Sequence, residues 1–148
     1  MGRIVKISNS PDETFQIAYK LAMGVSLPIM IGISGELGTG KTVFAKGFAE
    51  GLGVKELITS PTFLGVTESY TGRLPFVHMD FYKKVVTKET INYYLDKKSV
   101  LLIEWFENYD LVFGEQINLN TRVYIQYLES NEGNTFDNTR RIIMDSNM

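Results

Sequence analysis

The sequence predicts an α/β fold, and two observations carry this prediction. Short apolar runs bounded by turn signals are typical of buried strands, and segments with apolar residues at helical spacing lie between them. One such run, Pro28–Ser34, is followed by a glycine-rich turn and then by a helical pattern from about Gly40 to Leu52. Strand, turn and helix in this order form the first part of a βαβ unit, whose strands pair in parallel.

Composition limits the class of protein. The chain has 148 residues and no linker or repeat that divides it, so we predict a single domain over 1–148.

The composition also excludes several classes of protein. Because the chain has no cysteine, it is not a disulfide-stapled secreted module. The 15 Lys+Arg and 17 Asp+Glu nearly balance, which disfavours a broad basic surface for DNA or RNA. No apolar run reaches the roughly 18–20 residues of a membrane span, and Met1–Ser8 has no signal-peptide core. We therefore expect a soluble, cytoplasmic protein.

The N-terminal segment predicts an edge strand followed by a helix. Arg3–Ser8 has the alternating pattern of a short strand. Ser10 can cap a helix, Pro11 suits its first position and Glu13 can complete a capping box. Apolar residues then follow at helical spacing as far as Gly24, which predicts a helix that ends there.

Later segments predict the remaining elements. Apolar runs at Leu74–Met79 and Val100–Ile103 indicate two more buried strands, and Thr87–Leu95 between them indicates a short helix. Thr121–Leu128 and Arg140–Met144 read as strands joined by a polar, turn-prone connection. This arrangement predicts an antiparallel hairpin at the end of the chain.

The glycine-rich turn carries the strongest functional signal. Residues 35–42, Gly-Glu-Leu-Gly-Thr-Gly-Lys-Thr, fit the phosphate-binding pattern G-x-x-x-x-G-K-[ST]. Glycines allow successive backbone N–H groups to approach phosphate oxygens, and the helix that begins here adds its unpaired N–H groups. Lys41 supplies an ammonium to the β- and γ-phosphates, and the Thr42 hydroxyl can ligate Mg²⁺. We therefore predict a nucleotide site.

Two acidic residues end predicted strands. Glu104 follows Val100–Ile103, and Asp80 follows Pro75–Met79. In α/β sheets, ligand-binding groups gather at the carboxyl ends of the strands. Either acid can hold Mg²⁺ directly or through water, while the other orients or activates the attacking water. We predict that these two acids and Lys41 are the catalytic residues.

Three further features are less specific. His78, the only histidine, is expected to be a hydrogen-bonded packing residue, and Trp105 is expected to pack in a core or an interface. Thr59, Ser60 and Thr62 form a hydroxyl cluster after the phosphate-binding helix. Two interpretations of this cluster stay open: a switch loop that senses the γ-phosphate and Mg²⁺, and a capped turn.

Taken together, four segments resemble the bacterial TsaE (YjeE) family. They are the motif at 35–42, Thr59-Ser60-Pro61-Thr62-Phe63, His78-Met79-Asp80-Phe81-Tyr82 and Leu102-Ile103-Glu104-Trp105. Their order and spacing fit the family, and the likeness covers essentially the whole chain. The resemblance implies a P-loop NTPase-like three-layer fold, in which a mostly parallel sheet is flanked by helices and extended by an antiparallel hairpin.

The same resemblance implies an ATPase that uses ATP and Mg²⁺ and is needed to make threonylcarbamoyladenosine beside the anticodon of certain tRNAs. Family members act with the TsaD and TsaB proteins, which carry out the transfer chemistry, and ATP binding and hydrolysis support repeated turnover. The tRNA is therefore expected to meet this chain through the complex. Neither DNA nor a membrane is an expected partner.

The family's site residues carry over by position. The nucleotide-binding set is Asp12, Gly35, Gly38, Thr39, Gly40, Lys41, Thr42 and Val43, with Asp12 near the adenine. Thr42 and Glu104 are implied as Mg²⁺ ligands, Asp80 as the second essential acid, and Thr59, Ser60 and Thr62 as the switch loop. This sequence departs from the family at Val43, where a second Thr is frequent, and at Phe106, where proline is usual.

Two other functions stay open. A small-molecule kinase uses the same glycine-rich motif but needs an acceptor site and usually an arginine-rich lid, and the five arginines here form no mid-chain cluster. A nucleotide-switched binding module with negligible intrinsic hydrolysis would keep the same phosphate-binding residues. Phosphate release, alone and with partners, separates these functions from an ATPase.

Overall fold

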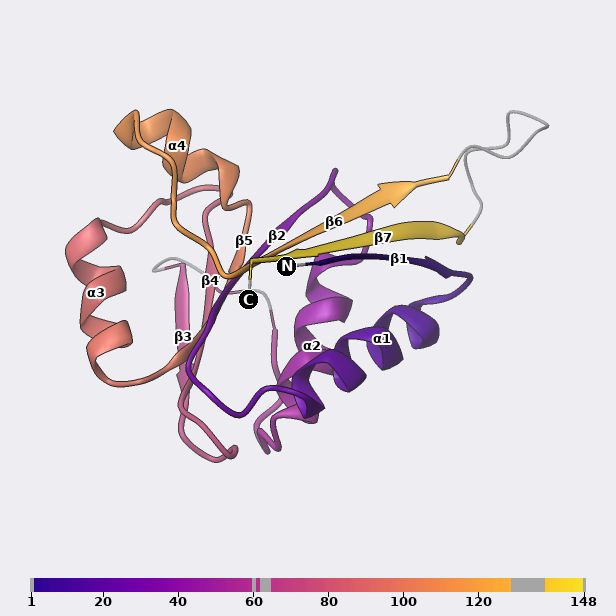
Figure 1. Cartoon of the computed structure of the whole chain (residues 1–148), viewed down its shortest axis with the longest axis horizontal. Helices are drawn as coiled ribbons and strands as arrows, with labels where there is room; N and C mark the ends of the chain where they lie inside the picture. The colour runs from indigo at the N-terminus through magenta and orange to yellow at the C-terminus, as the bar shows by residue number, and fades with distance from the viewer. Residues whose placement is uncertain (1, 60, 62–64, 129–137, 148) are drawn as a thin grey trace.

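The computed structural model describes residues 2–59, 61, 65–128 and 138–147, and all structural statements below concern them. These residues form one seven-stranded sheet with helices on both faces (Figure 1). The elements are β1 (Gly2–Ser8), α1 (Pro11–Met23), β2 (Met30–Ser34), α2 (Lys41–Gly51), β3 (Val66–Ser69), β4 (Phe76–Asp80), α3 (Lys88–Asp96), β5 (Val100–Glu104), α4 (Glu107–Phe113), β6 (Thr121–Tyr127) and β7 (Arg140–Ser146). Among the helices of these ranges, none has the length and apolar character needed to span a membrane.

The sheet is mixed, with a parallel centre. Its strand order is β1-β7-β6-β2-β5-β4-β3. Strands β6, β2, β5 and β4 run parallel to one another, β7 and β1 extend one side in antiparallel pairing, and β3 does so on the other. The predicted α/β fold, its antiparallel hairpin and its N-terminal edge strand are confirmed.

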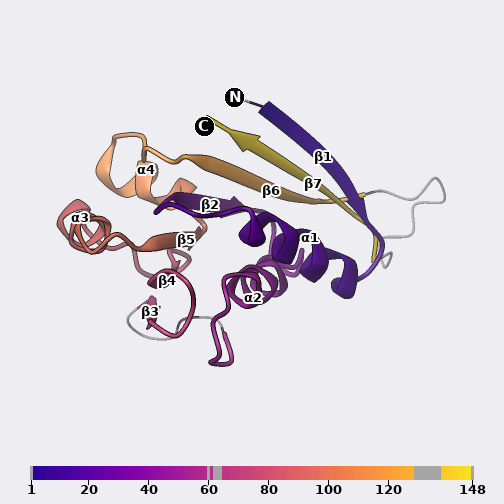
Figure 2. The ribbon, with the colours of Figure 1, turned by 60° about the horizontal axis from the view of Figure 1, so that its bottom comes forward.

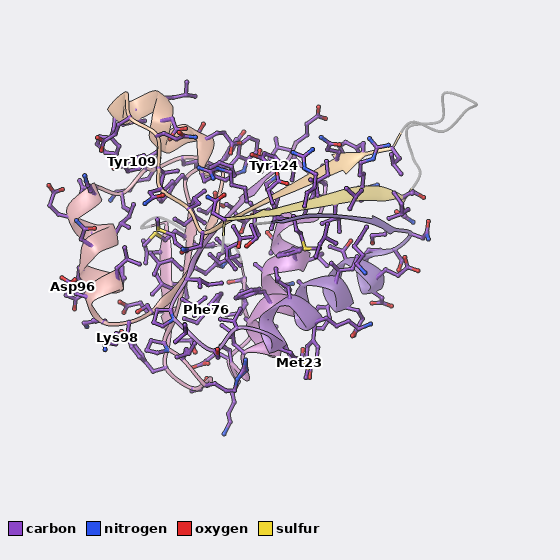
Figure 3. The ribbon with its side chains drawn as sticks, in the orientation of Figure 1. Met23, Phe76, Asp96, Lys98, Tyr109 and Tyr124 are labelled. Carbon is purple, nitrogen blue, oxygen red and sulfur yellow. The ribbon has the colours of Figure 1, made fainter. Side chains whose placement is uncertain are left out.

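Apolar side chains on the two faces of the sheet build two separate cores. Leu102 belongs to the core beneath α1 and α2, whereas its neighbour Ile103 belongs to the core beneath α3 and α4. Side chains alternate along a strand, so strands buried on both faces appear in the sequence as continuous apolar runs. Figure 2 shows α1 and α2 together on one side of the sheet. Figure 3 places Phe76 in the interior, where its ring centroid lies 6.1 Å from that of Phe48.

Local signals set the start of α1 as predicted. Ser10 is the N-cap, and its side chain accepts a hydrogen bond from the Glu13 amide at 3.1 Å. The Glu13 carboxylate accepts from the Asn9 amide at 2.6 Å, one residue before the cap. The reciprocal bond of a capping box is therefore replaced by a bond to the neighbouring amide, which still satisfies a donor at the helix entrance.

Two glycines in α2 allow it to approach α1 closely. A Cβ built on Gly47 would collide with the carbonyl oxygen of Phe15, and a Cβ on Gly51 would collide with that of Tyr19. Glycine within a helix normally costs stability relative to alanine. Here the close contact between the two helix backbones explains why glycine is present.

Replacing Gly47 by alanine is expected to lower the free energy of unfolding by about 1–3 kcal/mol, the usual cost of overpacking. The matched control is Gly24→Ala at the end of α1, where φ is −83° and the nearest atom to a built Cβ, Leu21 O, is 3.5 Å away. This control should be neutral or stabilising by about 0.4–1 kcal/mol. Urea unfolding of both variants checks the prediction, and equal stabilities would contradict it.

Two elements were not predicted from the sequence. Strand β3 has only four residues, of which Ser69 alone is buried. Helix α4 has seven residues, and its apolar Leu111 and Val112 are 80% and 60% exposed. Neither segment has the periodic burial that reveals longer elements, so both depend on their neighbours in the fold.

Candidate functional site

The glycine-rich turn connects the carboxyl end of β2 to the start of α2. Gly38 and Gly40 have φ values of +81° and +111°, in the left-handed region that glycine adopts without strain. Gly40 is the N-cap of α2, and no described side chain caps this helix. The first N–H groups of α2 therefore face the turn, as in anion-binding helix N-termini.

Lys41 is held over this turn. Its side chain is only 6% exposed, and Nζ donates hydrogen bonds to the carbonyl oxygens of Gly35 at 2.6 Å and Glu36 at 2.9 Å. Nζ also lies 4.5 Å from the centroid of the Trp105 ring. Burial lowers the pKa of Lys41, although the nearby Glu104 and other carboxylates act in the opposite direction.

The two predicted acids are neighbours in space. Asp80 and Glu104 are register partners at the carboxyl ends of the parallel strands β4 and β5. With Lys41 and Thr42 they line one cavity of about 360 Å³. The structure therefore brings together the predicted catalytic residues from three segments of the chain.

The two acids have different surroundings. Burial raises the pKa of Asp80, a hydrogen bond from the Tyr82 amide at 2.9 Å lowers it, and the charge of Glu104 raises it further. Glu104 is 3% exposed, and its Oε2 lies 2.6 Å from Nε2 of the fully buried His78. His78 is thus a hydrogen-bonded core residue, as predicted, and its partner is a candidate metal ligand.

Trp105 has a larger part in the site than its predicted packing role. Its backbone has a φ of +57°, a conformation that non-glycine residues rarely adopt and that is often found at functional sites. Its ring contacts Lys41 and lies 5.0 Å from the ring of Tyr82. It also lines both the 360 Å³ cavity and a second cavity of about 1040 Å³.

The hairpin reaches the turn through two side chains that the sequence analysis missed. The Tyr127 hydroxyl donates to Leu37 O at 2.6 Å, and Arg140 Nε donates to Thr39 O at 3.2 Å. The Arg140 guanidinium also lies 4.5 Å from the centroid of the Tyr127 ring. No sequence signal could have found these contacts, because they depend on where the hairpin lies in the sheet.

The remaining predicted residues lie around this centre. Thr39, Gly40 and Val43 line a cavity of about 110 Å³ together with Pro11 and Thr14 at the start of α1. Asp12 lines a different groove between β1 and α1, so its adenine contact stays a prediction. In the hydroxyl cluster, Thr59 is exposed. Ser60 and Thr62 lie outside the described residues, as does most of the connection between β6 and β7.

The donors around the 360 Å³ cavity fit Mg²⁺. Thr42, Asp80 and Glu104 line the cavity, and their side chains carry the hard oxygen donors that Mg²⁺ prefers. The described residues contain no group of three or more His, Cys, Asp or Glu side chains that could hold a metal ion by themselves. Mg²⁺ at phosphate sites usually takes only one or two carboxylates, with water and phosphate completing its shell.

The raised pKa of Asp80 predicts a pH-dependent stability. A carboxyl group whose pKa is higher in the folded state destabilises the fold when ionised, and this cost disappears as the pH falls through the folded pKa towards about 3.9. Asp80→Asn keeps the acceptor for the Tyr82 amide and removes the charge. It should therefore be more stable than wild type at pH 7, with the difference shrinking as the medium is acidified.

Urea unfolding between pH 3 and pH 8 measures this difference. Asp145→Asn is the control of opposite sign, because a hydrogen bond from Arg3 at 2.7 Å lowers the pKa of Asp145. Asp145 thus contributes stability above its unfolded pKa and loses it as the pH falls. A stability gain for Asp80→Asn that did not change with pH would contradict the prediction.

A mixed sheet with a parallel centre, a glycine-rich turn between β2 and α2, and acids at the ends of adjacent strands define a P-loop-like α/β protein. The family model described as "Threonylcarbamoyl adenosine biosynthesis protein TsaE" matches residues 8–141. The chain belongs to this TsaE family.

Individual relatives agree with this assignment. The tRNA threonylcarbamoyladenosine biosynthesis protein TsaE of Bacillus subtilis is 40% identical over 98 residues, which cover 65% of this chain and 62% of that protein. The protein of the same name from Treponema pallidum is 39% identical over 105 residues, covering 68% and 77%. The crystal structure of Bacillus subtilis YdiB matches 98% of this chain and 86% of its own, with a TM-score of 0.75 and 29% identity. The aligned region spans less than two thirds of the first of these relatives.

Proposed function

We propose that this protein binds and hydrolyses ATP with Mg²⁺, and that it is an accessory protein for threonylcarbamoyladenosine modification of tRNA, acting with TsaD and TsaB. One observation carries the proposal. In a member of the TsaE family, Lys41, Thr42, Asp80 and Glu104 line one cavity beside the glycine-rich turn.

Each group has a role in phosphoryl chemistry. Backbone N–H groups of Gly38–Thr42 and the Lys41 ammonium bind the phosphates and offset their charge. Thr42 and Glu104 hold Mg²⁺, which when bound supplies further positive charge to the phosphates. Asp80 orients the attacking water. Since there is little covalent chemistry for a protein to perform in phosphoryl transfer, such positioning and charge account for the catalysis.

The proposal extends to the partners. Loss of the γ-phosphate relaxes the switch loop that begins at Thr59, and this changes the surface that the chain presents to TsaD and TsaB. The tRNA meets the protein through that complex.

Phosphate release by the purified chain, alone and with TsaB and TsaD, tests the proposal. Wild type should be slow alone and stimulated by the partners, and Lys41→Ala and Glu104→Ala should be inactive in both conditions. Absence of stimulation, together with wild-type behaviour of both variants, would refute the ATPase function. Asp80→Asn with undiminished partner-stimulated hydrolysis would refute the role of Asp80.

The same assay separates the two other candidate functions. A small-molecule kinase would transfer phosphate to a metabolite instead of releasing it to water. A nucleotide-switched binding module would bind ATP without releasing phosphate even when both partners are present. In cells, deletion of the protein should remove threonylcarbamoyladenosine from tRNA, and expression of the wild-type chain, but not Lys41→Ala, should restore it.

A further inference from the structure

A buried hydrogen bond connects His78 to the site. His78 lies on β4 and Glu104 on β5, and both side chains are almost completely buried. In the parallel register His78 pairs with Leu102, two residues before Glu104, so the two side chains project from the same face of the sheet. His78 Nε2 and Glu104 Oε2 are 2.6 Å apart, a short distance typical of a hydrogen bond to a carboxylate.

This bond assigns the two carboxylate oxygens different roles. An ionised carboxylate only accepts hydrogen bonds, so Nε2 of His78 is the donor. With Oε2 held by His78, Oε1 is the oxygen left for the cavity that Glu104 lines together with Thr42 and Asp80. The carboxylate is then fixed in one orientation, with one oxygen directed to the protein interior.

The other ring nitrogen of His78 indicates that packing alone does not explain a histidine at this position. Nδ1 is buried and has no hydrogen-bond partner among the described residues. The centroid of the Phe76 ring lies 6.4 Å from that of the imidazole ring. A leucine would fill this space without a buried polar atom that lacks a partner. Within the part of the chain that the structure describes, the Nε2 contact with Glu104 is what distinguishes histidine from an apolar residue here.

We propose that His78 is a positioning residue for metal binding: it holds Glu104 so that one carboxylate oxygen is presented to Mg²⁺ in the nucleotide site. This inference rests on the proposed function, because it assigns Glu104 to the metal. Residues that orient a metal ligand by hydrogen bonding typically contribute 10- to 100-fold to metal affinity or activity.

The test measures metal-dependent nucleotide binding without catalysis. The dissociation constant of adenylyl imidodiphosphate, a non-hydrolysable ATP analogue, is determined by calorimetry once with Mg²⁺ and once with EDTA. The ratio of the two constants reports the contribution of the metal. Wild type is compared with His78→Leu, His78→Asn and His78→Gln, and urea unfolding of each variant is recorded in parallel.

The amide variants discriminate between the two ring nitrogens. The side-chain nitrogen of glutamine reaches the position of Nε2, whereas that of asparagine falls near Nδ1. We expect His78→Leu and His78→Asn to reduce the Mg²⁺ enhancement by about 10- to 100-fold, with binding in EDTA near wild type. His78→Gln should retain most of the enhancement. In a Glu104→Ala background, His78→Leu should cause no further loss.

The outcomes are distinguishable. If His78→Leu has the wild-type Mg²⁺ ratio but unfolds more easily, His78 is a packing residue and the inference is wrong. Equal behaviour of the asparagine and glutamine variants would also overturn it. If wild type itself binds the analogue without any effect of Mg²⁺, the proposed metal site fails, and the inference fails with it.

Discussion

Lys41→Met is expected to weaken ATP binding by about 10- to 150-fold. The structure holds the Lys41 ammonium over the turn by two backbone carbonyls, at 2.6 and 2.9 Å from Nζ, which is where the motif places the β- and γ-phosphates. A hydrogen bond to a charged group contributes about 1.5–3 kcal/mol, and each 1.4 kcal/mol is a factor of about ten in affinity. Loss of one such contact accounts for the expected change.

Methionine is chosen because it keeps the apolar stem of the side chain. The ammonium itself lies 4.5 Å from the centroid of the Trp105 ring, so this cation–π contact is lost with the charge, whereas the volume of the stem is kept. Lys46→Met is the matched control, since Lys46 lies on the same helix but does not line the cavities beside the turn. Calorimetric titration with ATP and Mg²⁺ measures the affinities. A fall in affinity that is equal for the two variants would show that the phosphate contact of Lys41 is not responsible.

Glu104→Gln is expected to reduce partner-stimulated hydrolysis by about 100-fold or more. A metal ligand contributes to charge neutralisation in the transition state, which is worth several kcal/mol, and about 1.4 kcal/mol corresponds to a factor of ten in rate. In wild type, His78 Nε2 lies 2.6 Å from Glu104 Oε2. Glutamine at position 104 retains an oxygen that can accept this hydrogen bond. The variant should therefore fold normally and lose chiefly its metal ligand.

The control for this variant is Glu107→Gln. Glu107 lies near enough to raise the pKa of Lys41, as Glu104 does, but it lines the larger cavity and not the 360 Å³ cavity. Glu107→Gln thus tests the effect of removing a nearby negative charge while Glu104, the proposed metal ligand, stays in place. Phosphate release with TsaB and TsaD, measured at increasing Mg²⁺, should be near wild type for Glu107→Gln. An equally large loss in both variants would contradict the assignment of Glu104 to Mg²⁺.

Much of the fold was predictable because its signals are local. The buried strands β2 and β5 appear as continuous apolar runs, and α1 and α2 have apolar residues at helical spacing. The cap at Ser10 is readable for the same reason, since its hydrogen-bond partner, the Glu13 amide, is only three residues away. Such features depend on neighbours in sequence and not on the rest of the molecule.

The shorter elements lacked such signals. Strand β3 forms because β4 offers an open edge with which it pairs, and its own four residues carry little alternation. Helix α4 follows Trp105, whose backbone is left-handed, and is anchored by Tyr109, which is buried in the core beneath α3 and α4. Its apolar Leu111 and Val112 face outward, so no periodic burial marks the segment in the sequence.

The sequence by itself determined which chemical groups are available: a glycine-rich turn at 35–42 with a phosphate-binding pattern, an ammonium at Lys41, and carboxylates placed after apolar runs. Each of these follows from residue type and short-range spacing. Only the tertiary structure decided how they meet. Parallel pairing of β4 with β5 sets Asp80 beside Glu104, and the hairpin brings Arg140 to the turn. The buried bond from His78 to Glu104 also depends on strand register, which is set by contacts between residues far apart in the chain.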